Sequence, residues 1–136
     1  MMSEEKASEL GVTPLAKIVA SGVSALNPEI MGLGPIDAIN QTLGRANMKI
    51  GDIDLVEINA AFAAQGLPSA EETGIDHDKL NVNGGSIALG HPFGMTGARI
   101  MTTLINGLED ADKEFGLETM CVGGGQGMAM IIQRMS

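Results

Sequence analysis

The sequence contains no tryptophan and no tyrosine, only three phenylalanines, and a single cysteine, Cys121. One cysteine excludes a disulfide bond within the chain and fits a reducing compartment. Without the large aromatics, the apolar volume of a core must come from aliphatic side chains and from 10 methionines. With 44% hydrophobic and 18% charged residues, the composition is that of a folded chain. Residues 1–136 are therefore expected to form one domain, with residues 1–13 as a polar lead-in.

Positive charge is also scarce, with 8 Lys and Arg against 17 Asp and Glu and a formal net charge of -9. The cations are scattered singly, which argues against a nucleic-acid partner because phosphate binding needs concentrated positive charge. Residues 81–98 carry no charged side chain, but five glycines, His91 and Pro92 interrupt them, so they do not resemble a membrane span. The acidic start of the chain lacks the pattern of a signal peptide. These features predict a cytoplasmic protein that is not embedded in a membrane.

The spacing of apolar residues predicts strands and helices in alternation. The order strand, helix, strand, helix, strand, helix, hairpin predicts an α/β fold with a five-stranded mixed sheet and helices on both faces. Strands are expected at 14–26, 53–58, 117–122 and 128–133, and helices are expected to begin at Gly34-Pro35, at Asn59 and at Thr96.

Cys121 and His91 are the candidate chemical groups, because a thiol and an imidazole exchange protons near neutral pH after modest tuning. Each has a plain alternative. A lone cysteine in an apolar strand is typical of a buried small hydrophobe, and His91, between Gly90 and Pro92, could simply shape a turn. A cysteine hydrolase using the two as a dyad is a weak hypothesis, because no third orienting group is evident.

The glycine run from Gly123 to Gly127 does not fit a nucleotide-binding loop. The dinucleotide fingerprint needs a following helix, and the phosphate loop needs its Lys and Ser/Thr, whereas strand-like residues follow here. A turn with peptide N–H groups free to bind an oxyanion is the better interpretation. Asn59, at a strand-to-helix corner, has a purely structural alternative as a helix N-cap.

Three segments, taken together, resemble the three C-terminal motifs of the thiolases in order and in spacing. They are Asn-Ala-Ala-Phe-Ala at 59–63, Asn-Gly-Gly-Ser-Ile-Ala-Leu-Gly-His-Pro-Phe-Gly-Met-Thr-Gly-Ala-Arg at 83–99, and Cys-Val-Gly-Gly-Gly-Gln-Gly at 121–127. Met-Gly-Leu-Gly-Pro at 31–35 resembles a further segment of the family. The resemblance covers nearly the whole chain but only the C-terminal part of a complete thiolase, and it implies a thiolase-like C-terminal domain.

The resemblance implies acyl transfer between a 3-ketoacyl-CoA and coenzyme A, by thiolysis or by the reverse Claisen condensation. His91 resembles the histidine that activates the nucleophilic cysteine, and Cys121 resembles the second cysteine, which moves the α-proton of acetyl-CoA. Asn59, through a water, would form one oxyanion hole with His91, and the N–H of Gly123 would contribute to the second. Met31 and Phe62 match positions near the acyl pocket, although both could equally be core residues.

Two departures from the family pattern bear on activity. Ala60 stands where the family usually has Glu, and the chain's only cysteine matches the acid–base residue rather than the nucleophile. The resemblance therefore implies an N-terminal thiolase half or subunit as partner, an oligomer, coenzyme A thioester as substrate, and no metal or permanently bound cofactor. A non-catalytic structural or regulatory subunit is the alternative.

Overall fold

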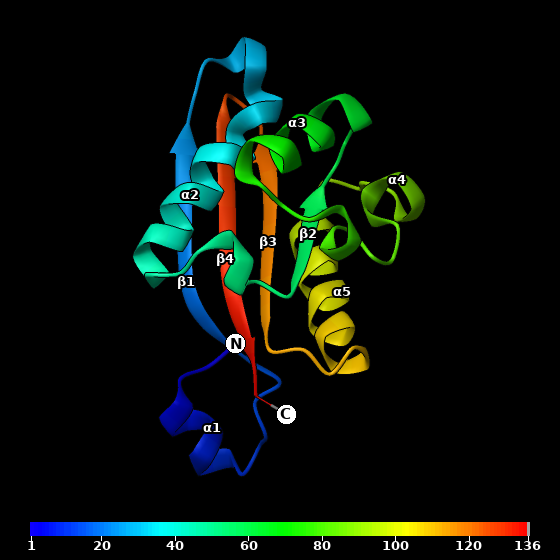
Figure 1. The fold of residues 1–136 in the computed structure, drawn as a ribbon. Helices are drawn as coiled ribbons and strands as arrows, with labels where there is room; N and C mark the ends of the chain where they lie inside the picture. Colours follow the sequence, from blue (N-terminus) through cyan, green and yellow to red (C-terminus); the bar gives the residue numbers. More distant parts are fainter. Residues whose placement is uncertain (136) are drawn as a thin grey trace.

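The computed structural model describes residues 1–135, which form a mixed four-stranded sheet with helices on both faces (Figure 1). The strands are β1 (Ala16–Ala25), β2 (Leu55–Asn59), β3 (Phe115–Val122) and β4 (Gln126–Arg134). The α-helices are α1 (Glu4–Leu10), α2 (Gly34–Ala46), α3 (Ala63–Thr73), α4 (Gly85–Leu89) and α5 (Thr96–Asp110). Short 3-10 helices are η1 (Pro28–Leu33), η2 (Ile50–Asp52) and η3 (His77–Lys79).

The strands lie in the order β1-β4-β3-β2. β4 is antiparallel to both β1 and β3, and β2 is parallel to β3. The predicted α/β fold, mixed sheet and C-terminal hairpin are confirmed, but the described residues give four strands rather than five. Before α4, only an isolated parallel bridge joins Val56 to Leu80. Positive φ angles at Asn81, Gly84 and Gly85 then turn the chain away from the sheet, so no fifth strand extends.

Each face of the sheet has its own apolar cluster. Ala38, Ile39 and Leu43 of α2 pack with Ile58 and Ile131 on one face. On the other face, Leu104 and Leu108 of α5 pack with Leu55 and Ile132. The spacing of these residues along α2 and α5 is what the sequence predicted for an amphipathic helix with one buried stripe.

The beginning of α3 differs from the prediction. The helix begins at Ala63, after Phe62 as its N-cap residue, and not at Asn59. Asn59 is the last residue of β2 and pairs with Met120 of β3, and its side chain bonds to other segments. The interpretation of Asn59 as a helix N-cap is therefore wrong. Its polar side chain instead makes hydrogen bonds at the end of the sheet.

Two further features complete the architecture. The polar lead-in forms α1, which Ser3 caps through a hydrogen bond from the Lys6 N–H to the Ser3 Oγ. Among residues 1–135, none of the helices combines the length and the apolar character needed to cross a membrane.

Candidate active site

The candidate site lies where β2 and β3 end, at the edge of the sheet from which α3 and α4 continue (Figure 1). Because the two strands are parallel, their carboxyl ends meet at this edge. Asn59 ends β2 with a side chain that is fully buried, and its ladder partner Met120 immediately precedes Cys121. The fold thus brings the motifs that begin at Asn59 and Cys121, about sixty residues apart, to one edge of the sheet, because neighbouring parallel strands end on the same side.

His91 comes to the same edge from the loop between α4 and α5. Gly90, with a φ of 92°, allows the sharp exit from α4 that a side chain would disfavour. The Nε2 atom of His91 lies 3.4 Å from the Asn59 Nδ2 atom, and its Nδ1 atom lies 2.6 Å from the Thr96 Oγ1 atom. The ring is therefore held from both sides while the residue remains exposed.

A buried polar network lies directly beneath Asn59. Ser86 donates its hydroxyl hydrogen to the Asn59 Oδ1 atom. Arg99 donates from Nη2 to the Ser86 Oγ at 2.6 Å and from Nη1 to the Glu57 Oε2 at 3.2 Å. The side chains of Arg99 and Glu57 are only 11% and 3% exposed, so this ion pair is shielded from water. Five polar side chains thus join in one chain of contacts from Glu57 to His91.

Cys121 is half-buried near the end of β3. Burial raises the pKa of its thiol, so the protonated form is favoured in this chain. The polar contacts described for residues 1–135 join Asn59 to His91, but none joins Cys121 to either of them. The structure therefore places the three residues at the same edge and brings only two of them into contact.

The remaining expected site residues lie around this edge. Gly123 is exposed in the β3–β4 turn, where its carbonyl accepts a hydrogen bond of 3.2 Å from the Gln126 Nε2. Phe62 is 74% exposed, so the alternative that it is a core residue is wrong for this chain. Met31, in η1, is half-buried. His77 is exposed on η3, as its polar surroundings indicated.

Ala60, at the position where the resemblance implies Glu, is buried near α3. A Cβ atom at Gly66 would lie 2.9 Å from the Ala60 Cβ, which shows how closely the two backbones approach. Two other acids are withdrawn from water: Glu57 is buried and Glu118 is half-buried, and they pair in register across β2 and β3. Burial, together with the nearby Glu57 charge, raises the pKa of Glu118 to about 7, and burial also raises that of Glu57.

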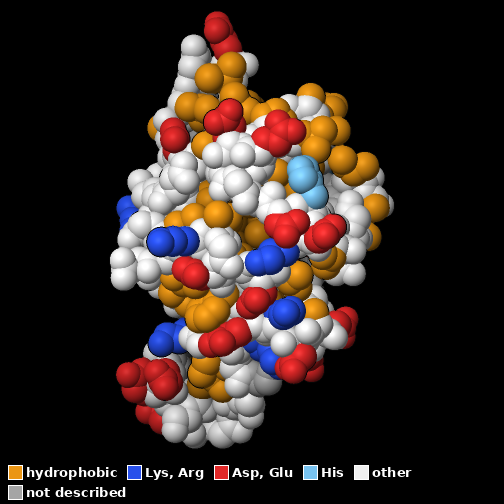
Figure 2. All heavy atoms as spheres, in the orientation of Figure 1, with side chains coloured by type: hydrophobic (Ala, Val, Ile, Leu, Met, Phe, Trp, Pro, Cys, Tyr) orange, Lys and Arg blue, Asp and Glu red, His pale blue; other side chains and the backbone are white. Residues whose placement is uncertain are grey.

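Large apolar side chains surround the site and remain exposed. They are Phe62, Ile87, Leu89, Phe93 and Met95. Figure 2 shows apolar side chains gathered over the part of the molecule that carries η1, α3 and α4, at the top and upper right of the view. Exposed apolar clusters of this kind mark surfaces that bind a ligand or another protein.

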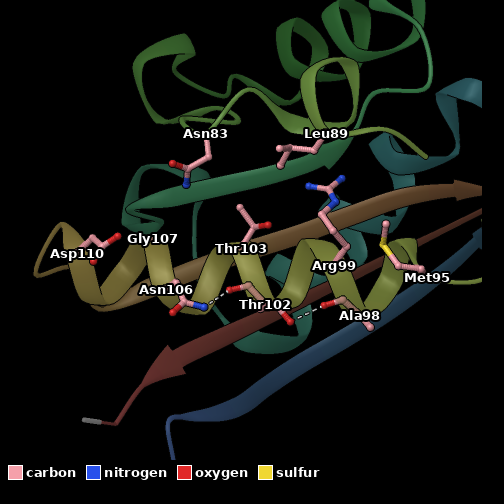
Figure 3. Close-up of a pocket in the computed structure, with 10 residues that line it drawn as sticks. All are labelled: Asn83, Leu89, Met95, Ala98, Arg99, Thr102, Thr103, Asn106, Gly107 and Asp110. Carbon is pink, nitrogen blue, oxygen red and sulfur yellow. Dashed lines mark hydrogen bonds between the residues drawn. The ribbon is translucent and has the colours of Figure 1, made fainter. Parts of the chain in front are cut away.

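An open groove of about 610 Å³ runs along α5 (Figure 3). Most of its lining comes from α5 itself, including Ala98, Thr102 and Asn106, with Asn83 and Leu89 on the opposite side. Asn59, His91 and Cys121 do not line it. The groove is therefore a surface beside the candidate site rather than the catalytic cleft. Among residues 1–135, no group of three His, Cys, Asp or Glu could hold a metal ion.

Sequence reasoning gave no role to Ser86, Thr96, Arg99 or Glu57. The first three lie inside the 83–99 motif, and each now contacts another member of the site. Glu57 was the one signal in the sequence that could have pointed to this network. It is a charged residue in the middle of an apolar strand, and a buried charge requires a partner of opposite charge.

Comparisons with known proteins find relatives that match nearly the whole chain. The family model described as "Thiolase, C-terminal domain" matches residues 12–134. A 3-ketoacyl-CoA thiolase of Vibrio vulnificus (strain YJ016) is 52% identical, covering 98% of this chain and 35% of the relative. An acetyl-CoA acetyltransferase of Escherichia coli (strain K12) is 48% identical, covering 100% of this chain and 34% of the relative.

Solved structures show the same likeness in three dimensions. The crystal structure of the Bacillus anthracis acetyl-CoA acetyltransferase superposes with a TM-score of 0.95 and 49% identity over 98% of this chain. That of human mitochondrial 3-ketoacyl-CoA thiolase gives a TM-score of 0.95 and 45% identity over 98%. Each match covers 34% of the larger chain, so this chain spans about a third of its relatives' length. On this evidence the chain belongs to the thiolase C-terminal domain family.

Proposed function

We propose that the chain is the C-terminal half of a thiolase and takes part in acyl transfer between a 3-ketoacyl-CoA or acetyl-CoA and coenzyme A. The observation that carries the proposal is the meeting of Asn59 and His91 at the edge where β3 delivers Cys121. This arrangement lies within a family whose named relatives are 3-ketoacyl-CoA thiolases and acetyl-CoA acetyltransferases. The chain supplies acid–base and oxyanion groups, and the nucleophilic cysteine comes from the missing N-terminal half.

His91 and Cys121 divide the proton transfers between them. His91 takes the proton of the partner's nucleophilic thiol, so that a thiolate attacks the acyl carbonyl. Cys121 exchanges a proton with the α-carbon of the acetyl group. Because burial raises the pKa of its thiol, Cys121 rests protonated and is ready to protonate the enolate formed in thiolysis. In condensation it acts as the base, which requires a stabilised enolate.

The enolate and the tetrahedral intermediate need hydrogen-bond donors at their oxygen atoms. Asn59 presents its amide Nδ2 beside His91. Asn59, through a water, forms one oxyanion site with His91, which donates from Nε2 once it has taken the thiol proton. The exposed Gly123 backbone N–H belongs to the second, shared with the partner's nucleophile. Met31 and the exposed Phe62 contribute to the acyl pocket. The substrate is a coenzyme A thioester, and no permanently bound cofactor or metal is required.

The missing half packs on the α5 side of the sheet. α5 covers mainly β2 and β3 there and leaves Val23 and its ladder partner Met128 on β1 and β4 exposed at 50% and 46%. The groove along α5, between this helix and Asn83 and Leu89, adds to the open surface. The chain spans about a third of its relatives, so the remaining two-thirds supply the natural cover for this surface. Most cations for the coenzyme A phosphates must also come from that part, because this chain has a net charge of -9.

The proposal is tested by assembly. The chain is purified alone and together with the N-terminal part of the Vibrio vulnificus relative, and thiolysis of acetoacetyl-CoA is followed. The chain alone should be inactive, and the assembled pair should be active. Activity of the chain alone would contradict the half-site argument.

A structural or regulatory subunit is the second candidate, favoured by Ala60, since a buried acid usual in the family is absent. It predicts a pair that assembles stably, seen by co-elution in size-exclusion chromatography, but has no thiolysis activity. The same experiment therefore separates the two candidates.

A further inference from the structure

We propose that Arg99 is a positioning residue that fixes the orientation of the Asn59 amide through Ser86, and thereby fixes which nitrogen of His91 carries the proton. None of the proposed catalytic groups contacts Arg99 directly. Its effect passes along the buried contacts from Glu57 to His91. The catalytic consequence rests on the proposed function, whereas the orientation of Asn59 does not.

The direction of each hydrogen bond follows from Arg99. A guanidinium has five N–H donors and no acceptor, and it stays protonated in proteins. The contact between Arg99 Nη2 and Ser86 Oγ can therefore run only from Arg99 to Ser86. The single hydroxyl hydrogen of Ser86 is then left to donate elsewhere, and Asn59 lies within its reach. Glu57 accepts from the other arm of the guanidinium and holds it in place.

Ser86 in turn decides how the Asn59 amide lies. An amide can be turned by 180° with almost no change in shape, so its orientation depends on its partners. Because Ser86 donates, the atom facing it must be the Asn59 Oδ1, and the NH₂ group must face the opposite way, toward His91. Without Ser86 the two orientations would differ little in energy. The network therefore keeps an N–H donor at the proposed oxyanion site.

The same logic extends to the ring of His91. An N–H of Asn59 points at Nε2, so the neutral ring accepts there and carries its hydrogen on Nδ1. The Nδ1–H then donates to the Thr96 Oγ1 atom at 2.6 Å, and the Thr96 hydroxyl donates to the Pro92 carbonyl oxygen at 3.3 Å. In this arrangement the hydrogen bonds from Arg99 through Ser86, Asn59, His91 and Thr96 to the Pro92 carbonyl oxygen all run in one direction. This tautomer leaves Nε2 without a hydrogen, which is the state that the proposed base needs.

The chain offers a clean readout, because His77 and His91 are its only histidines and His77 is exposed away from the network. Long-range ¹H–¹⁵N spectra of the full chain at alkaline pH report the tautomer of each neutral ring. A His77→Asn variant assigns the two signals. In the unaltered chain we expect His91 to carry its hydrogen on Nδ1. A ring that carries it on Nε2 would overturn the proposal.

Two variants break the hydrogen-bonded network in different places. Ser86→Ala removes the hydroxyl, and Arg99→Lys keeps a positive charge for Glu57 but loses the fork that reaches Ser86 as well. Both should shift His91 away from the Nδ1–H form and leave the His77 signal unchanged. Ser69→Ala, a buried helix serine that bonds to the Gln65 carbonyl oxygen, and Arg45→Lys are the matched controls and should leave both rings unchanged.

An unchanged His91 tautomer in a folded Ser86→Ala chain would contradict the proposal. If one of the two variants loses its dispersed amide spectrum, the His91 tautomer in the other variant decides the matter. In the assembled pair, Arg99→Lys should lower kcat by on the order of a hundredfold, with KM little changed, because a misplaced donor costs rate rather than binding. An inactive pair would contradict the proposed function alone, since the tautomer is measured without it.

Discussion

Cys121 combines a half-buried thiol with a position at the edge of the sheet. If it moves the α-proton, Cys121→Ser in the assembled pair should reduce condensation by roughly 10²–10⁴-fold, since a hydroxyl exchanges its proton far less readily than a thiol. Acylation of the partner's nucleophilic cysteine should persist, because that step depends on His91. Product formation measures the first effect, and intact-protein mass measures the second. Loss of acylation as well would contradict the role assigned to Cys121.

Glu118 is a second residue whose burial has a measurable consequence. Its pKa is raised from 4.5 to about 7, mainly by burial, and its Oε2 atom has no hydrogen-bond partner among residues 1–135. Below pH 4.5 the carboxyl is protonated in both the folded and the unfolded chain. As the pH rises, the unfolded chain releases this proton first, so the stability contributed by the protonated group is lost up to about pH 7.

Glu118→Gln removes this titration. The variant should be more stable than the unaltered chain at pH 8, by on the order of 3 kcal/mol, with the difference shrinking toward pH 4.5. Urea unfolding across this pH range measures the free energy of unfolding. Glu71→Gln, on the exposed surface of α3, is the control and should give a small difference at every pH. A constant difference for Glu118→Gln would show that its titration is not the cause.

Between the helices and strands, the closest approach joins the beginning of α2 to β4. A Cβ atom at Gly127 would collide with the carbonyl oxygen of Gly34, and both groups are backbone, so neither can move aside cheaply. Gly127→Ala should therefore lower the free energy of unfolding by more than about 2 kcal/mol. Gly44→Ala, in the last turn of α2 where a Cβ meets nothing within 4 Å, should instead raise it by roughly 0.5 kcal/mol. Thermal and urea unfolding compare the two, and equal effects would contradict the packing argument.

The elements that the sequence predicted well are those with one dominant periodicity. α2, α5 and the β3–β4 hairpin have buried stripes or alternation that local spacing encodes. The beginning of α3 was predicted at Asn59 because an asparagine before an alanine-rich run is typical of an N-cap. Ladder pairing with Met120 and the bond from Ser86 outweigh that preference, and both come from residues distant in sequence. Arg99 was overlooked for the same reason, since its partners Glu57 and Ser86 lie 42 and 13 residues away.

The molecule as a whole has one covered face and one that is only half covered. α2 and α3 pack over the first face, whereas α5 leaves β1 and much of β4 open on the second. The exposed surface of α5 carries small, uncharged side chains at Ala98, Thr102 and Asn106, and its exposed charges, Glu109 and Asp110, lie at the end of the helix. Small side chains allow another element to approach closely, and uncharged side chains lower the cost of removing water. This surface is therefore suited to contact with the N-terminal half that we propose as the partner.

Thr102→Glu tests this interpretation. Thr102 is exposed on α5 and its hydroxyl donates within the helix, to the Ala98 carbonyl oxygen, so glutamate should leave the fold intact. Assembly with the N-terminal part of a relative would bury the new charge without a partner and should weaken binding by on the order of a hundredfold. Analytical ultracentrifugation measures assembly, circular dichroism checks the fold, and Thr13→Glu, on the exposed lead-in before β1, is the matched control. If Thr102→Glu and Thr13→Glu assemble equally well, the N-terminal half does not dock on α5, because an unpaired carboxylate cannot enter a packed interface without this penalty.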